Sequence, residues 1–165
     1  MLARTRLTQE IACYHNAGLS HGSIATRENE VVDKTPHAVV IFDGECRFCS
    51  RWVDLLLRFD RRDVFRFAAR QTESGGALMR GAGLPEGGVG SIVVLDHGEI
   101  LQRSSAVLRM LSLLGPPFSL AAIFKIIPAG ARDYLYDWFA RNRLKWFGRR
   151  QACRLPSESE RHRFV

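Results

Sequence analysis

The chain has 165 residues, of which 46% are apolar and 25% are charged, and its formal net charge at pH 7 is +7. A chain of this size can fold as one domain that buries about two-thirds of its unfolded surface, so a second domain is not needed. The longest strongly apolar stretch, Phe118 to Ile127, contains Lys125 and lies between prolines. It is therefore too short for a membrane-spanning helix of about 20 residues.

The positive charge is concentrated at the carboxyl-terminal end. From Arg141 onward there are eight basic residues but only two acidic ones, Glu158 and Glu160. Such a tail can contact nucleic acid, anionic lipid or an acidic partner. The alternative is a solvated helix face on which carboxylates pair with some of the charges.

The chain contains four cysteines: Cys13, Cys46, Cys49 and Cys153. Their density is too low for a disulfide scaffold, and no hydrophobic export signal is recognisable. We therefore expect a reducing, cytoplasmic compartment. Arg4 and Arg6 keep organelle targeting open as a minor alternative, although Glu10 disfavours it.

The first 36 residues mix polar side chains with isolated apolar ones and show no sustained period. We predict that residues 1–36 are an N-terminal extension that is partly disordered. Cys13 and His15 form only a weak metal-binding signal, and we interpret them as incidental surface residues.

The ordered domain is expected to begin near His37. The apolar, β-branched run Ala38 to Phe42 is typical of a central strand buried on both faces. The apolar residues from Trp52 to Phe59 then follow a helical face, and this helix should end near residues 60–63. A second strand at Val64 to Ala68 completes a β-α-β unit, which implies parallel strands.

The pattern continues with a short helix, two strands around a tight turn, and another helix. The turn is Asp96-His97-Gly98, and Ser104 or Ser105 is expected to cap the last helix. The expected ranges are residues 76–81 for the short helix, 91–95 and 99–103 for the strands, and 104–114 for the last helix.

The motif Asp43-Gly44-Glu45-Cys46-Arg47-Phe48-Cys49 places two thiols where the first strand gives way to a helix. The start of a helix offers unpaired N–H groups and the positive end of its dipole, which favour a thiolate. We predict that Cys46 is the accessible attacking thiolate. Cys49 lies one turn later on the same face and is expected to resolve the mixed disulfide. This cycle requires no bound cofactor.

Three other residues are candidate supporting groups. We expect Arg47 to add to the stabilisation of the thiolate, whereas the charge of Asp43 opposes it. Asp43 either relays a proton or caps the turn before the helix, and we favour the structural role. Cys153 is a buried apolar residue, a third redox thiol or a site of intermolecular disulfide formation, and we again favour the structural role.

The element order, with Cys-x-x-C at the first strand-to-helix junction, resembles the thioredoxin fold. More specifically, Asp43-Gly44-x-Cys46-x-x-Cys49 resembles the defining motif of the DCC family of thiol-disulfide oxidoreductases. The resemblance spans about residues 38–165 and implies an α/β, thioredoxin-like mixed sheet with flanking helices. It continues through Ser104-x-Ala106, Pro128, Asp133, Tyr136, Asn142-Arg143, Phe147-Gly148-Arg149 and Cys153-x-x-Pro156.

The chain departs from better-studied thioredoxins in one respect. Those proteins place a cis-proline opposite the redox pair, whereas the equivalent stretch here, Val89-Gly90-Ser91, has no proline. Gly90 allows a close backbone approach. Substrate docking by the usual thioredoxin route is therefore not assured.

We predict a redox core at residues 37–115 and a C-terminal helical extension at residues 116–165 that packs on it. The extension should contain two helices, with Pro128 at or before the start of the second. Its aromatic residues are expected to pack on the core. The alternative is a hydrophobic partner surface that also contacts an anionic membrane peripherally.

Our main hypothesis is a thiol-disulfide oxidoreductase that acts on a disulfide-containing protein or a small-molecule thiol substrate and is recycled by an external thiol reductant. The second hypothesis is a non-enzymatic binding module. In it, the basic helix Arg141 to Arg150 contacts RNA or an acidic protein, and the cysteines are structural or bind zinc. No RNA-binding signature is present, so we do not expect a nucleic-acid partner. Structural zinc needs four ligands. Cys153 and His97 would complete only a speculative site with the two motif cysteines, so we expect no metal.

Overall fold

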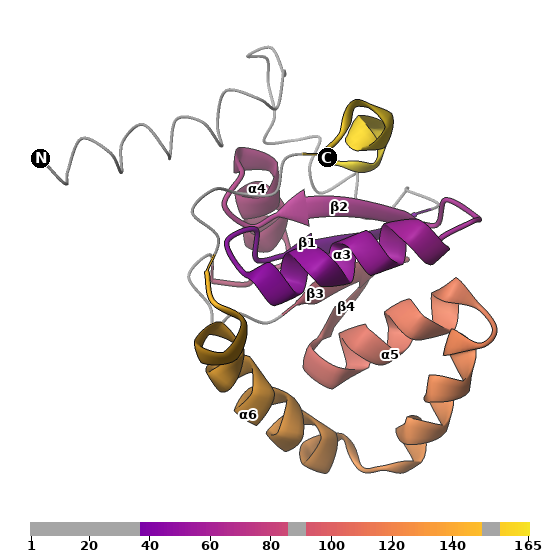
Figure 1. Ribbon diagram of the computed structural model, residues 1–165. Coiled ribbons are helices and arrows are strands. Elements are labelled where there is room, and N and C mark those ends of the chain that lie inside the picture. The colour runs from indigo at the N-terminus through magenta and orange to yellow at the C-terminus, as the bar shows by residue number, and fades with distance from the viewer. Residues whose placement is uncertain (1–36, 86–91, 150–155) are drawn as a thin grey trace, which may run out of the picture.

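The computed structural model describes residues 37–85, 92–149 and 156–165 (Figure 1). Its four strands form one mixed sheet in the spatial order β2-β1-β3-β4. Strand β1 is parallel to β2 and antiparallel to β3, and β3 and β4 form an antiparallel hairpin. The strands are β1 (Ala38–Phe42), β2 (Phe65–Ala69), β3 (Val93–Asp96) and β4 (Glu99–Gln102).

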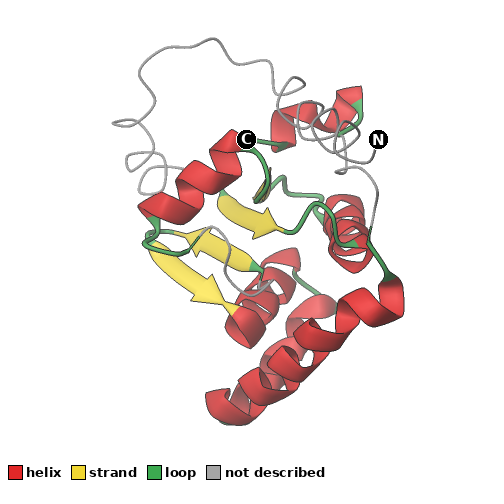
Figure 2. Ribbon diagram, turned by 90° about the vertical axis from the view of Figure 1, so that its left-hand side faces the viewer, coloured by secondary structure: helices red, strands yellow, loops and turns green. Residues whose placement is uncertain are grey.

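Helices cover both faces of this sheet (Figures 1 and 2). Helices α3 and α5 lie on one face, α4 lies on the other, and η1 and α6 curve around the outside of α5. The α-helices are α3 (Arg47–Phe59), α4 (Glu73–Gly81), α5 (Arg103–Leu114) and α6 (Ala129–Phe147). The 3-10 helices are η1 (Phe118–Ile126) and η2 (Glu158–Arg163).

Strand β1 is the centre of the molecule, and all five of its residues are buried. Val40 and Phe42 belong to the core cluster on the side of α3 and α5, whereas Val39 and Ile41 belong to the cluster on the side of α4. Successive side chains of a strand point to opposite faces, so a continuous apolar run fills both clusters. The sequence-based prediction of a central strand is confirmed.

A β-α-β unit followed by an antiparallel hairpin and a helix gives this chain a thioredoxin-like fold. The predicted α/β class and mixed sheet are confirmed. Among the described residues, no helix is both long enough and apolar enough to cross a membrane.

Local hydrogen bonds explain where the observed boundaries differ from the predicted ones. Helix α4 begins at Glu73, before the predicted residue 76, because the Thr72 hydroxyl accepts the Gly75 N–H at 3.1 Å and caps the helix. Strand β3 begins at Val93; the first residue of its predicted range, 91, lies outside the described residues.

The predicted cap of α5 is wrong. Its N-cap is Gln102, which makes no side-chain capping bond, and Ser104 lies inside the first turn. The carboxylate of Asp133, on α6, accepts hydrogen bonds from both the backbone N–H and the hydroxyl of Ser104. A tertiary contact therefore supplies the acceptor that a local cap would have provided.

The C-terminal extension follows α5. The first of its two predicted helices is the 3-10 helix η1, and the second, α6, begins directly after Pro128, as predicted. The chain ends against the edge strand β2, where Phe164 pairs with Phe67 and the Val165 N–H donates to the Phe67 carbonyl at 3.0 Å. This pairing covers part of an edge that would otherwise be open.

Candidate active site

The two thiols of the Cys-x-x-C motif lie at the start of α3, just beyond the end of β1. Cys46 is the N-cap of α3, and its Sγ accepts the backbone N–H of Cys49 at 3.4 Å. In the usual N-cap a side-chain oxygen accepts this N–H, whereas here the sulfur of Cys46 accepts it. Because the start of a helix favours negative charge, this position favours the thiolate over the thiol. Both cysteines are free thiols in this structure.

Both thiols are covered. Cys46 is 0% exposed and Cys49 is 6% exposed, so the prediction that Cys46 is accessible is wrong. Both belong to the core cluster, and the segment that follows α6 lies against Cys46. Gly148 ends this helix with a φ of 75°, and Arg149 then forms an antiparallel backbone bridge with Cys46. Glycine adopts positive φ at little cost, which allows this reversal of the chain.

Asp43 organises the turn between β1 and α3. Its Oδ1 accepts the Glu45 N–H at 3.1 Å, and the same oxygen accepts Nε2 of Gln71 at 2.7 Å. The side-chain oxygen of Gln71 in turn accepts the Gly44 N–H at 2.9 Å. The Asp43 side chain therefore caps the turn before the helix.

Two arginines balance the charge of this carboxylate. Nη2 of Arg70, which follows β2, and Nη2 of Arg143, on α6, each lie 3.5 Å from Oδ2 of Asp43. Arg143 is only 4% exposed, and its Nε is buried without a hydrogen-bond partner among the described residues. The positive charge of Arg143 favours a thiolate at Cys46, and the negative charge of Asp43 opposes it.

The two thiols are held in different protonation states. A hydrogen bond from the Cys49 side chain, the Cys49 backbone N–H and the charge of Arg143 lower the pKa of Cys46 to about 6, against the effects of burial and of Asp43. The side-chain hydrogen bond to Cys46 and burial raise the pKa of Cys49 well above its usual range. These opposite shifts favour a thiolate at Cys46 and a thiol at Cys49.

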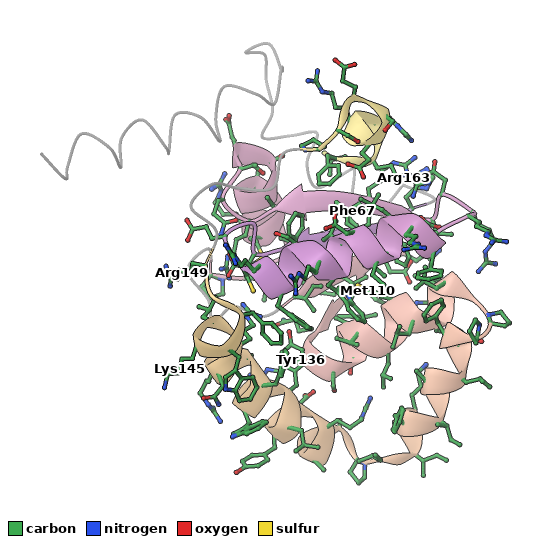
Figure 3. The ribbon with its side chains drawn as sticks, viewed as in Figure 1. Phe67, Met110, Tyr136, Lys145, Arg149 and Arg163 are labelled. Carbon is green, nitrogen blue, oxygen red and sulfur yellow. The ribbon has the colours of Figure 1, made fainter. Side chains whose placement is uncertain are left out.

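Helix α6 is fastened to α3 by aromatic contacts, which fixes the position of Arg143. The ring of Phe48 lies 4.9 Å from that of Phe139 and 5.1 Å from that of Phe147, measured between centroids. On the same helix, the Tyr136 hydroxyl accepts the Ile92 N–H at 3.1 Å, and Figure 3 shows its side chain reaching toward the core.

The other sequence-derived candidates lie elsewhere. Arg47 is exposed at the first residue of α3, and the arginine whose charge lowers the pKa of Cys46 is Arg143. Cys13, Cys153 and the whole stretch Val89-Gly90-Ser91 lie outside the described residues. His97 lies in the β3–β4 turn, at the end of the sheet opposite Cys46. Within the described ranges, no group of three or more His, Cys, Asp and Glu side chains is arranged to hold a metal ion.

Comparisons with known proteins show the family of this chain. The family model described as DCC1-like thiol-disulfide oxidoreductase matches residues 40–149. The chain belongs to this family. The match ends at the residue whose backbone pairs with Cys46, so the segment that covers the thiol lies within the family's extent.

Two curated proteins illustrate the relationship. The uncharacterized protein YuxK of Bacillus subtilis strain 168 is 33% identical over 133 residues, which are 81% of this chain and 97% of that protein. A chloroplastic DCC family protein of Arabidopsis thaliana is 34% identical over 124 residues, or 74% of this chain and 71% of the relative. No solved structure matches the chain.

Sequence reasoning missed the roles of Arg143, Arg70 and Gln71. Arg143 entered the sequence analysis only as part of the family-like tail and of the basic C-terminal segment. The one signal available was an arginine on a helix rich in aromatic residues, which does not reveal that this arginine faces inward. Its role depends on a contact with Asp43 across 100 positions of the chain.

Proposed function

We propose that this chain is a thiol-disulfide oxidoreductase in which Cys46 is the nucleophile and Cys49 the resolving thiol. The observation that carries the proposal is the asymmetry of the pair. The Cys46 sulfur accepts the Cys49 N–H and has a pKa of about 6, while the pKa of Cys49 is raised. A thiolate is the reactive species in disulfide exchange, so Cys46 is the thiol prepared to attack.

Disulfide exchange at this pair takes place in two steps. The Cys46 thiolate attacks one sulfur of the substrate disulfide, forms a mixed disulfide and releases the first substrate thiolate. Cys49 then loses its proton and attacks the Cys46 sulfur, which forms the Cys46–Cys49 disulfide and releases the second thiolate. The two released thiolates take up the Cys49 proton and one proton from water. An external dithiol reductant restores the pair by the reverse exchange.

The burial of Cys46 adds a requirement to this cycle. An incoming disulfide must approach in line with the bond that breaks, and the backbone of Arg149 lies against Cys46. Substrate therefore has to displace residues 148–149 from the start of α3. This displacement breaks the exposed Arg149–Glu45 ion pair at 3.6 Å. Exposed ion pairs contribute little free energy, so breaking this one costs little.

We propose a disulfide-containing protein or a small-molecule disulfide as substrate and a cellular thiol as reductant. No metal or cofactor enters the cycle. A reducing compartment such as the cytoplasm suits a protein whose four cysteines do not form a dense framework.

The test compares reduction of insulin by dithiothreitol in the presence of wild-type and variant proteins. Cys46→Ser should abolish the catalysed rate. Cys49→Ser should accumulate a mixed disulfide on Cys46, detected by mass spectrometry without reduction. Cys13→Ser, outside the motif, is the matched control and should retain the full rate. Equal rates in wild type and both motif variants would remove the proposal.

A further inference from the structure

Large apolar side chains gather on the outer side of the C-terminal extension. Within residues 118–147, ten of them are more than one-third exposed, and Ile126 reaches 82%. No residue of η1 is buried, although all but two of its nine residues, Ser119 and Lys125, are apolar. We call the ten residues the η1–α6 apolar surface: Leu120, Ile123, Phe124, Ile126, Ile127, Tyr134, Leu135, Trp138, Trp146 and Phe147.

Helix α6 lacks the usual amphipathic arrangement. Its one fully buried residue is Arg143. Its two acidic residues are paired with residues of α5: Asp133 accepts from Ser104, and Asp137 lies 3.5 Å from Arg103. A globular helix normally turns its apolar side inward. Tyr136, Phe139 and Leu144 pack inward beside these polar contacts, whereas Tyr134, Leu135, Trp138 and Trp146 are exposed.

The charged groups beside this surface are basic. Lys125 on η1 and Arg141 and Lys145 on α6 are exposed, and none of the three forms an ion pair with a described residue. Arg149 follows α6 and is 67% exposed even in its contact with Glu45. Figure 3 shows the side chains of Lys145 and Arg149 pointing away from the core.

We propose that the η1–α6 apolar surface binds peripherally to an anionic lipid membrane. Exposed apolar patches of this extent are rare on monomeric soluble proteins, because leaving them in water is costly. Tryptophan, tyrosine and long basic side chains are the residues that settle at the headgroup region. Leucine, isoleucine and phenylalanine between them would enter the acyl boundary, and the basic residues would meet the anionic headgroups.

Charge argues against a second copy of this chain as the occupant. In a two-fold dimer the same patch contacts itself, so Lys125, Arg141 and Lys145 would face their own counterparts. Both acidic residues of α6 already have partners, Ser104 for Asp133 and Arg103 for Asp137. An anionic bilayer supplies the missing negative charge without such repulsion. The inference stands on this surface alone and does not depend on disulfide exchange.

The test is co-sedimentation of the full-length, reduced protein with vesicles of phosphatidylcholine, with and without phosphatidylglycerol. We expect binding to the anionic vesicles and much weaker binding to the neutral ones. The double variant Leu120→Ser/Ile126→Ser should lower the partition coefficient at least about tenfold. Arg141→Gln and Lys145→Gln should each lower it about fivefold.

Matched controls lie elsewhere on the surface. Ile100→Ser removes an apolar side chain on β4 that is 43% exposed, and Arg61→Gln removes an exposed charge after α3. Both should bind anionic vesicles like the wild type, and circular dichroism should show that every variant is folded. Failure of the wild type to bind anionic vesicles, or equal binding by all variants, would overturn the proposal. Sedimentation velocity gives the competing outcome: a dimer that the Leu120/Ile126 variant dissociates, without vesicle binding, would assign the surface to a second copy.

Discussion

The guanidinium of Arg143 lies against the carboxylate of Asp43, 100 positions earlier in the chain, with Nη2 and Oδ2 3.5 Å apart. Asp43 belongs to the turn that precedes Cys46, and Arg143 belongs to the C-terminal extension. The charge that favours the Cys46 thiolate therefore comes from outside the β-α-β unit that carries the thiols. The redox core and the extension contribute to one site.

This relationship gives our first prediction, for Arg143→Met. Loss of the positive charge should raise the pKa of Cys46 by about one unit, because a nearby opposite charge favours the ionised form by that order. The thiolate absorbance at 240 nm, taken as the difference between the reduced variant with and without Cys46→Ser, measures the midpoint. At pH 6.5 the reduction of insulin should also slow.

The control for this variant is Arg141→Met, two residues earlier on α6 and exposed. It removes the same charge from the same helix but not from the site, so the midpoint should stay near that of the wild type. An equal shift in both variants would mean that net charge, and not the contact with the site, sets the pKa.

The lowered pKa of Cys46 also predicts how stability depends on pH. The pKa of Cys46 is about 6 in the folded protein and 9.0 for a free thiol, so between these values the unfolded state binds one more proton than the folded state. The free energy of unfolding of the reduced protein should therefore rise with pH from 6 toward 9, by up to about 1.4 kcal/mol per unit. This contribution is fully present above the unfolded pKa and is lost as the pH falls through 6.

Urea denaturation of the reduced protein at a series of pH values measures this slope. Cys46→Ser and the oxidised wild type both lack the thiolate, and their stability should rise less over the same range. A slope shared by all three proteins would show that other groups are responsible.

Much of the fold could be predicted because its signals are local. The apolar run at 38–42, the helical spacing after Cys49 and the glycine in the β3–β4 turn each specify an element within a few residues. At the start of α5 the prediction failed because a distant group replaced a local one. Ser104 does not cap α5 because Asp133, on α6, reaches its N–H and hydroxyl.

The candidate site likewise combines features that follow from neighbouring residues with features that depend on distant ones. The Cys-x-x-C spacing and the turn-capping geometry of Asp43 are properties of seven consecutive residues. The burial of Cys46 and the role of Arg143 are not, because both depend on how α6 returns to the start of α3. The exposed position of Arg47 follows for a related reason: the first turn of α3 is already covered by Phe139 and Phe147 packing on Phe48, which leaves Arg47 on the solvent side.

A further prediction separates the two effects of Asp43. Asp43→Ala should destabilise the protein by about 3–5 kcal/mol, because Arg143 would be left buried without its carboxylate partner. The same change should lower the pKa of Cys46, since the negative charge of Asp43 raises it. Urea denaturation and the absorbance titration measure the two effects separately.

The matched control for Asp43 is Asp137→Ala, which removes a more exposed aspartate that lies 3.5 Å from Arg103. Exposed ion pairs contribute little, so the loss should stay below about 1 kcal/mol and the pKa of Cys46 should not move. If Asp43→Ala were as mild as this control, Arg143 would not depend on Asp43 for compensation.

The last prediction concerns Gly75, which allows the start of α4 to approach the end of β2. A Cβ on Gly75 would collide with the carbonyl oxygen of Ala69, a backbone atom that cannot move aside cheaply. Arg70 and Gln71, which hold Asp43, lie between these two residues. Gly75→Ala should therefore destabilise the protein by about 1–3 kcal/mol and also disturb the turn before Cys46.

Gly130 is the control, because it lies in the first turn of α6 and a Cβ there would meet nothing within 4 Å. Gly130→Ala should stabilise the protein by up to about 1 kcal/mol through helix propensity. Thermal unfolding of the two variants should shift in opposite directions, and a common direction would show that α4 does not need this close approach.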